Sequence, residues 1–367
     1  MNPSRLALAR KRRRLTKVAL ARLVNLSPRS LSSYESGVTC PPREILEALA
    51  DALRFPVSFF SRPDVEELPA DGASFRALKS MTAGQRDAAL AAGALAVELN
   101  RWITDQFTLP SADLPDLRDC EPEDAARVLR VEWGIGVLPI GNMVHLLESK
   151  GIRVFSLAER AKQVDAYSLW HAETPFVFLN TMKTPEHGRM DAAHELGHLV
   201  LHRHGGTRNR GRDVEKDAQR FGAAFLMPED SIRTLVRRPI LPTMPQLIQL
   251  KRNWKVSVAA LARRLHVLGL LSDWSYRGVN VELSRYGRSR EPGGVTDRET
   301  SQVLDRVFSH LKQRGILKSS VAQDLGLHVA DLELLIFGLS PMTRSRRRGS
   351  CGDREAVARR ARMKLVP

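Results

Sequence analysis

Apolar residues at helical spacing dominate the chain, and the first of these patterns lies close to the N-terminus. Between Val18 and Val24 the apolar positions share one face of a helix, and Leu31 and Tyr34 form the apolar face of a second one. The spacing therefore predicts two short amphipathic helices in close succession.

The residues between these two patterns suit a tight turn. Asn25 tolerates the left-handed backbone conformation that such a turn needs. Ser27 can accept a hydrogen bond as the N-cap of the second helix, and Pro28 suits the first position of that helix. Gly37 then ends it. Two short helices joined in this way predict a helix-turn-helix.

The middle of the chain predicts longer helices and two short strands. Residues 83–107 have alanine and leucine at helical spacing, which indicates one long helix. Two further amphipathic helices end at Gly134 and Gly151. The runs IRVFSL, from Ile152, and PFVFLN, from Pro175, are β-branched and aromatic. They predict a small sheet, to which the segment between them contributes in part.

Two more helix-turn-helix layouts follow in the last third of the chain. One spans residues 254–277, and the other begins at Lys318. Either layout has two interpretations, since such a helix pair can contact DNA or pack on the rest of the protein or on a dimer partner.

The charge of the chain is strongly positive and gathers at its two ends. The formal net charge is +16, with 57 basic and 41 acidic residues. Arginine and lysine fill the run Arg10–Arg14, here called the N-terminal basic run, and arginine dominates Arg344–Arg348. Such a balance favours a polyanionic partner, and with the predicted helix-turn-helix that partner is DNA.

Cysteine content and apolar run lengths indicate where the protein works. Cys40, Cys120 and Cys351 lie far apart, which fits a reducing compartment and excludes a cysteine-built zinc finger. No apolar run approaches the roughly 20 residues that cross a bilayer, and the N-terminus lacks a signal-peptide pattern. We therefore expect a cytoplasmic, nucleoid-associated protein without a membrane partner.

Four histidines interrupt an otherwise apolar helical pattern in DAAHELGHLVLHRH, residues 191–204. His194 and His198 are four residues apart, so both imidazoles project from one face of a helix and can reach a single ion. Glu195 lies beside them and can take a proton from a metal-bound water. Gly197 weakens the helix, which is easier to accept if another element approaches it closely. His202 continues the same face and is expected to support the site from behind or to be structural.

A catalytic zinc site uses three protein ligands, so a third ligand is needed. The segment DVEKDAQRFGAAFLMPED predicts a second helix with Glu215 on its first turn. Ala218 follows one turn later, where a larger side chain would block helix packing. Asp217 is the competing candidate, and the remaining interpretation is an acidic surface patch. A zinc held by His194, His198 and Glu215 is our expectation, with manganese as the other metal that this donor set accepts.

The first sixty residues resemble the lambda-repressor-like, XRE-type helix-turn-helix domain. The resemblance implies that the second helix enters the major groove of DNA and reads bases through Arg29, Ser30 and Ser33. It also implies that Lys17 and the N-terminal basic run hold phosphates. Asn25 stands where that family usually has glycine. The alternative is a helical hairpin that packs on the next domain with a solvated basic face.

The sequence around the histidines resembles the ImmA/IrrE family of metallopeptidases. PFVFLNTMKTPEHGRMDAAHELGHLVLHRH and EKDAQRFGAAFLMP carry the resemblance, and Asp217, Ala218 and Gln219 replace a common EAN. The resemblance maps the HExxH motif of the family onto His194, Glu195 and His198, and its glutamate ligand onto Glu215. It implies a site-specific endopeptidase, fused to an XRE domain, that cuts a transcriptional repressor or similar regulatory protein.

The mechanism expected from these residues has Glu195 as general base and a substrate that adds as a strand to the sheet ending in FVFLN. Tyr167 and His171 are the candidate oxyanion donors. The competing function is a regulator or antitoxin-like protein that uses the peptidase fold for sensing or partner binding and does not cut. Expected partners are DNA, the regulatory protein and a second copy of the chain.

The expected fold is α+β and mainly α, with a small β-sheet. It combines an all-α helix-turn-helix domain, a zincin-like metallopeptidase domain of the gluzincin type and a helical C-terminal region. The predicted parts are the helix-turn-helix domain (1–66), a linker with a connecting helix (67–115), the metallopeptidase domain (116–232), the helical region (233–340) and a basic tail (341–367).

Overall fold

The structure is a computed structural model that describes residues 1–66, 68, 81–157, 166–203, 213–236, 242–286, 291–294 and 296–340. These residues are mainly helical and contain one three-stranded sheet, which confirms the predicted fold class. The chain divides into two compact units. The first is built from residues 1–68, 82–111 and 300 onward, and the second from residues 69–81 and 112–299. The predicted basic tail, and residues 67 and 69–80 of the predicted linker, lie outside the described residues.

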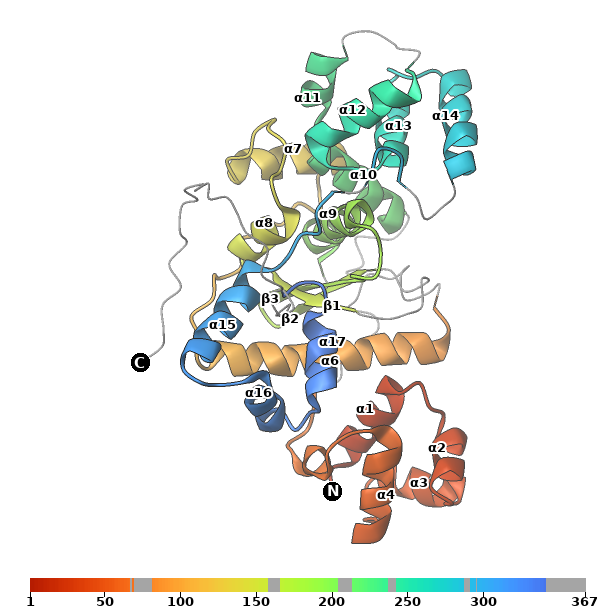
Figure 1. Ribbon diagram of the computed structural model, residues 1–367, viewed down its shortest axis with the longest axis vertical. Coiled ribbons are helices and arrows are strands. Elements are labelled where there is room, and N and C mark those ends of the chain that lie inside the picture. Colours follow the sequence, from red (N-terminus) through yellow and green to blue (C-terminus); the bar gives the residue numbers. More distant parts are fainter. Residues whose placement is uncertain are drawn as a thin grey trace, which may run out of the picture. The chain divides into compact units, whose positions relative to one another are not determined.

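The first unit begins with the predicted helix-turn-helix (Figure 1). Asn25 has the left-handed φ of 53°, and the Ser27 side chain accepts a hydrogen bond from the Ser30 N–H, as the sequence predicts. Gly37, which follows the second helix of the helix-turn-helix (α3, Pro28–Glu35), has a φ of 74°. The N-terminal elements are α1 (Pro3–Arg12), α2 (Lys17–Leu23), α3 (Pro28–Glu35), α4 (Arg43–Leu53) and the 3-10 helix η1 (Val57–Ser61).

A long helix and the C-terminal helices complete the first unit. The long helix α6 (Ala83–Thr104) begins with a capping box in which Thr82 and Gln85 bond each other's backbone N–H groups. An ion pair between Arg5 and Glu98, with Nη2 and Oε1 2.5 Å apart, joins α1 to α6. The C-terminal helices are α15 (Gln302–Gln313), α16 (Lys318–Asp324) and α17 (Val329–Ile336).

The second unit contains the three-stranded sheet and helices of mixed length. Its elements are α7 (Pro122–Glu132), α8 (Met143–Ser149), β1 (Arg153–Ser156), β2 (Tyr167–His171), β3 (Thr174–Leu179), α9 (Pro185–Leu201), α10 (Val214–Leu226), α11 (Glu229–Leu235), α12 (Met244–Trp254), α13 (Val258–Val267) and α14 (Asp273–Tyr286). None of the described helices combines the length and the apolar character that crossing a membrane requires.

The sheet has the strand order β1-β3-β2. Strand β3 pairs with β1 in parallel and with β2 in antiparallel, so both of its edges are occupied. The strand PFVFLN is therefore the central strand, so a substrate strand could add to this sheet, among the described strands, only beside β1 or β2. Helix α9 packs on β2 and β3, which places the histidine helix against one face of the sheet (Figure 1).

Candidate metal centre

Helix α9 carries the two histidines of the HExxH motif. It starts where the Thr184 side chain accepts a hydrogen bond from the His187 N–H, with Pro185 at its first position. From there the helix runs without interruption to Leu201. His194 and His198 consequently project from the same face, and their Nε2 atoms lie 3.0 Å apart.

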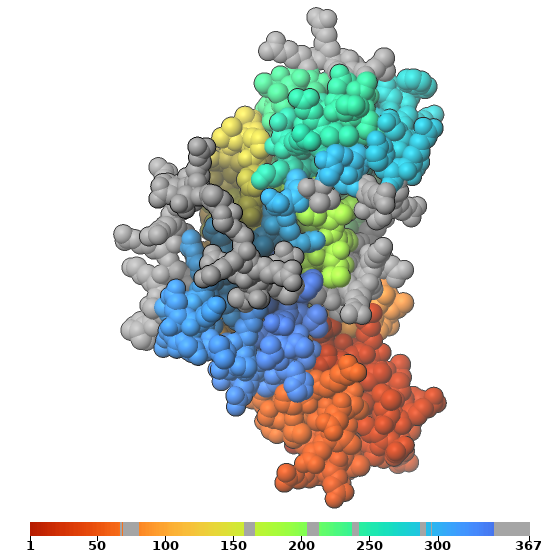
Figure 2. All heavy atoms as spheres, viewed as in Figure 1, coloured from red at the N-terminus to blue at the C-terminus, as the bar shows by residue number. Residues whose placement is uncertain are grey.

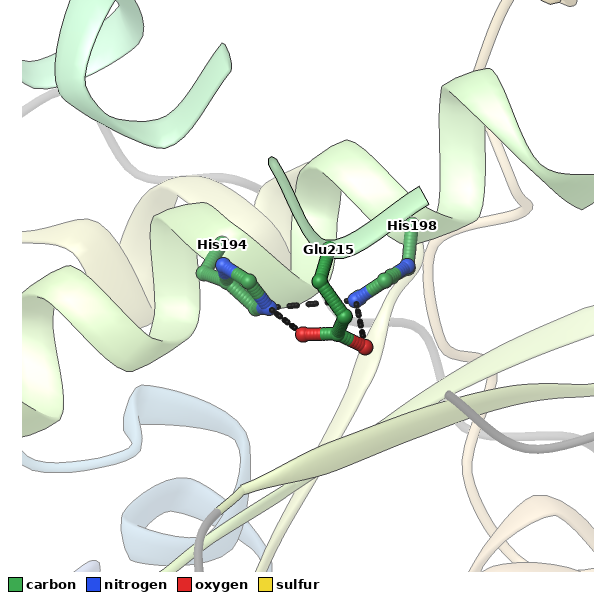
Figure 3. Close-up of side chains that lie close together, drawn as sticks. All are labelled: His194, His198 and Glu215. Carbon is green, nitrogen blue, oxygen red and sulfur yellow. Dashed lines mark hydrogen bonds and ion pairs between the residues drawn. The ribbon is translucent and has the colours of Figure 1, made fainter. Parts of the chain in front are cut away.

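Glu215 joins these histidines from the first turn of α10. Its Oε2 lies 3.4 Å from Nε2 of His194, and its Oε1 lies 3.4 Å from Nε2 of His198. Figure 3 shows the three side chains pointing toward one another from the two helices. Among the described residues, the group of histidine, cysteine and acidic side chains able to hold a metal ion consists of these three, with ligand atoms within 4.8 Å of one another. Asp217 is outside that group.

Small residues allow α9 and α10 to approach closely enough for this meeting. A Cβ added at Gly197 would lie 3.0 Å from Cδ1 of Phe221 and 3.2 Å from Cα of Ala218. A Cβ added at Gly222 would lie 3.0 Å from the backbone nitrogen of His194. The element that approaches Gly197 is therefore α10, and glycine on both helices permits backbone contact at the height of the cluster.

Burial and hydrogen bonding act on the charges of the cluster in opposite directions. Burial by itself would raise the pKa of Glu215, but hydrogen bonds to His194 and His198 and the charge of these rings hold that pKa well below its usual range. Burial would lower the pKa of His194, but its hydrogen bond to Glu215 and the nearby charges of Glu195 and Asp191 raise it. The carboxylate is thus an anion at neutral pH, which suits a cation between the three side chains.

Glu195, the residue after His194, is buried, with 2% of its surface exposed. The hydroxyl of Ser168, in β2, donates a hydrogen bond of 2.7 Å to its Oε2. Sequence reasoning missed Ser168. The available signal is period-two alternation, which puts Ser168 and Trp170 on one face of β2, and Trp170 donates to the Leu199 carbonyl of α9. A lone hydroxyl on the face of a strand that covers the motif helix is a candidate partner for the motif glutamate.

His202 and the two candidate oxyanion donors occupy different positions relative to the cluster. His202 is buried, with Nδ1 3.1 Å from Nδ1 of His198, so it supports the ring of that histidine from behind. His204 lies outside the described residues. Tyr167 stacks on Phe178 at 4.5 Å, on the sheet face opposite to Ser168, and alternation places His171 there too. Tyr167 and His171 therefore lie on the face of β2 opposite to Ser168.

The predicted base-reading residues lie on α3. Arg29 is exposed, while Ser30 and Ser33 are half-buried. The Ser30 and Ser27 hydroxyls are 2.8 Å apart, and Ser33 Oγ accepts a hydrogen bond from the Thr39 hydroxyl.

Several basic side chains that were expected to contact phosphates form hydrogen bonds or ion pairs within the protein. Lys17 donates to the Ser32 hydroxyl and lies 3.5 Å from Glu35 Oε2. Arg10 forms two hydrogen bonds with the Glu35 carboxylate, and Arg13 binds the carbonyl of Leu53. The N-terminal basic run therefore includes structural arginines, which runs of charge in a sequence do not reveal.

Family models match both parts of the chain. Residues 147–266 match the model described as IrrE N-terminal-like domain, and residues 6–60 match a helix-turn-helix model. Comparison with curated proteins gives no match. The first match includes α9 and α10 with the histidine and glutamate cluster, and the second includes most of α1 and all of α2 to α4.

These matches confirm the resemblances that the motifs indicate. The fold and the site define a transcriptional regulator that combines a helix-turn-helix DNA-binding domain with a peptidase-like domain. The peptidase-like domain is the part of the chain, residues 147–266, that is similar to the IrrE N-terminal-like domain.

Proposed function

We propose that the IrrE-like domain is a zinc-dependent endopeptidase that cleaves a transcriptional repressor or a similar regulatory protein, so that cleavage switches gene expression. The observation that carries this proposal is the meeting of His194, His198 and Glu215 beside Glu195. The exposed Arg29 on α3 supports DNA as the second partner.

The donor set fits zinc. Two imidazole nitrogens and one carboxylate from two helices leave room for a water or substrate oxygen, as catalytic zinc sites require. Manganese accepts the same donors and is the other candidate metal. Bound zinc supplies a Lewis acid for the scissile carbonyl and makes the bound water acidic near neutral pH. His202, against the second ring nitrogen of His198, would fix the orientation of that ligand.

Glu195 would carry out the proton transfers. Its Oε2 is held by the Ser168 hydroxyl, which orients the carboxylate. The carboxylate would take a proton from the attacking water and deliver it to the nitrogen of the leaving amine. Both transfers need one oriented carboxylate, which a buried residue with a fixed hydrogen bond provides.

The substrate would bind along β2. This strand lies at an edge of the described sheet and contacts α9. Strand β3, in contrast, is paired with another strand along both of its edges. An extended polypeptide added to an edge strand gains main-chain hydrogen bonds, and its side chains alternate between the two faces of the sheet. Binding there brings a peptide bond toward the α9 face.

The metal content of purified variants tests the site. We expect about one zinc per chain in the wild type by inductively coupled plasma mass spectrometry, and none in His194→Ala or Glu215→Ala. Asp217→Ala is the matched control, because Asp217 lies on the same helical turn outside the cluster, and it should retain the metal. Metal retained in Glu215→Ala, or lost in the Asp217 variant, would contradict this ligand set.

Cleavage tests the enzyme. The zinc-loaded protein is incubated with a proteome-derived peptide library, and new termini are identified by mass spectrometry. Glu195→Gln should retain zinc and lose cleavage by roughly 10²–10⁴-fold, the usual contribution of general acid–base catalysis. Equal cleavage by this variant would refute the general-base role. A zinc-loaded wild type that cuts nothing would favour the competing function, a regulator whose peptidase fold senses or binds a partner.

A further inference from the structure

The three helices α15 to α17 repeat the three helices α1 to α3, displaced by 301 residues. Helices α2 and α3 begin at Lys17 and Pro28, and helices α16 and α17 begin at Lys318 and Val329. The repeat is thus in register through both helices and the turn between them. The family match to a helix-turn-helix covers residues 6–60 alone and does not include the second copy.

The turns of the two copies agree residue by residue. Left-handed residues occur in pairs at the same three places: Arg14 and Gly315, Asn25 and Gly326, Gly37 and Gly338. In the central turn, Leu26 N–H donates to the Ala21 carbonyl at 2.8 Å, and Leu327 N–H donates to the Ala322 carbonyl at 2.7 Å. Turns that agree at this level show one supersecondary structure built twice.

The cores agree as well. The apolar residues that hold the three helices together are almost wholly buried in both copies. The matching pairs are Leu6 and Val307, Leu20 and Val321, Ala21 and Ala322, and Leu31 and Leu332.

We infer that residues 302–340 are a second helix-turn-helix module in which α17, at the position of the recognition helix, binds the first module instead of DNA. One part of the inference, that the first module and not the second reads DNA bases, rests on the proposed DNA binding of the first module. The contact between α17 and the first module is argued from the residues that form it and does not depend on DNA binding.

The charge of the two copies supports this division of roles. Residues 1–36 contain nine basic and one acidic side chain, whereas residues 302–337 contain four of each. The counterparts of Arg29, Ser30 and Ser33 are Ala330, Asp331 and Leu334. A helix with an acidic and two apolar residues at these positions offers neither phosphate contacts nor donors for guanine.

The carboxylate of Asp331 is instead used inside the unit. It is 6% exposed and accepts hydrogen bonds of 2.8 and 2.9 Å from Nη1 and Nη2 of Arg13, at the end of α1. The two-pronged geometry is that of a strong arginine–carboxylate pair. In Figure 2 the blue surface of this C-terminal module adjoins the orange and red surface of the first module.

A second contact is made between the turn that joins α16 and α17 and the first module. A Cβ added at Gly326 would lie 3.3 Å from Cα of Phe59 in η1, and the side chain of Arg62 donates to the carbonyl of Asp324. The segment that carries the left-handed glycine therefore packs on backbone of the first module. Both ends of the chain consequently build one DNA-binding unit, and the IrrE-like domain lies between them in the sequence.

A matched pair of variants tests which of the two modules reads DNA bases. Arg29→Glu and Ala330→Glu place the same charge at equivalent positions of α3 and α17. Binding is measured by fluorescence anisotropy with a duplex selected on the wild-type protein and with a random duplex. We expect Arg29→Glu to weaken binding of the selected duplex about tenfold or more, and Ala330→Glu to leave it unchanged. Equal loss in both variants would overturn the inference.

A double-mutant cycle tests docking without DNA. In the full chain, Asp331→Ala should lower the melting temperature of the DNA-binding unit by roughly 2–4 °C, and by much less in an Arg13→Ala background, because the partner is already gone. Glu333→Ala, at an exposed position of α17, is the control and should not depend on Arg13. The same shift from Asp331→Ala in both backgrounds would overturn docking. A wild-type chain that binds no DNA would instead refute the proposed DNA partner, and the cycle would still decide the docking.

Discussion

The orientation of single side chains decides what the candidate site can do chemically. Glu195 lies directly after His194 in the sequence, yet it points toward the sheet while His194 points toward α10. One helix residue advances the side-chain direction by about 100°. The motif therefore separates the proposed ligand and the proposed base by direction, and Ser168, from another element, forms a hydrogen bond with the proposed base.

Removal of the Ser168 hydroxyl should reduce turnover without loss of the metal. We expect Ser168→Ala to lower kcat about 10-fold or more with KM little changed, since outer hydrogen-bond partners commonly contribute 10–100-fold. Ser168→Thr should restore most of the rate. Zinc content and cleavage kinetics are measured together, and the control is Trp170→Phe, which removes a hydrogen bond from the same strand face without touching Glu195. Loss of zinc in Ser168→Ala would show a structural role instead.

At the scale of elements, the candidate metal centre depends on the distance between α9 and α10. Gly197 and Gly222 face each other's helix, and added side-chain atoms there would meet backbone or a buried ring. The two helices are so closely packed that an added side-chain atom at either glycine would force them apart and change the distances within the cluster. A single methyl group between them is therefore a sensitive probe of the site.

Gly222→Ala should separate the two helices and weaken metal binding. We expect a loss of stability of about 1–3 kcal/mol from overpacking and a weaker affinity for zinc, measured by competition with a chromophoric chelator. Gly188→Ala is the matched control in α9, because nothing lies within 4 Å of its added Cβ, and alanine favours the helix. Unchanged zinc affinity in Gly222→Ala would show that the cluster does not depend on this contact.

At the scale of the whole molecule, the chain folds as two compact units that do not follow a single cut in the sequence. The first unit takes residues from both ends of the chain, and the second contains the IrrE-like domain. Each unit has a core of its own, so each should respond separately to its own ligand.

Calorimetry of the full chain should show this separation. We expect two unfolding transitions, and added zinc should raise the upper or lower one alone, whichever belongs to the second unit. Zinc at about 100 times its Kd adds roughly 2.7 kcal/mol to the unit that binds it. His194→Ala, which lacks a ligand, is the control and should show no shift. One transition that moves as a whole with zinc would contradict independent units.

Local interactions let the sequence by itself determine several features of this protein. The turn at Asn25, the N-cap at Ser27 and the shared face of His194 and His198 each depend on residues within four positions of one another. The mainly α fold class and the presence of a helix-turn-helix follow from the same short-range periodicity. These predictions are confirmed because backbone geometry repeats over one turn whatever the rest of the chain does.

Tertiary structure alone decided which distant residues meet. The Ser168–Glu195 hydrogen bond and the Arg13–Asp331 pair join residues 27 and 318 positions apart, and the pairing of β3 with β1 joins residues 23 positions apart. The sequence names Glu215 as the third ligand, but the distance to the imidazoles is set by glycine contacts between α9 and α10. Such meetings depend on strand pairing and helix packing, because a side chain's periodicity fixes the direction it faces and not the partner that it finds there.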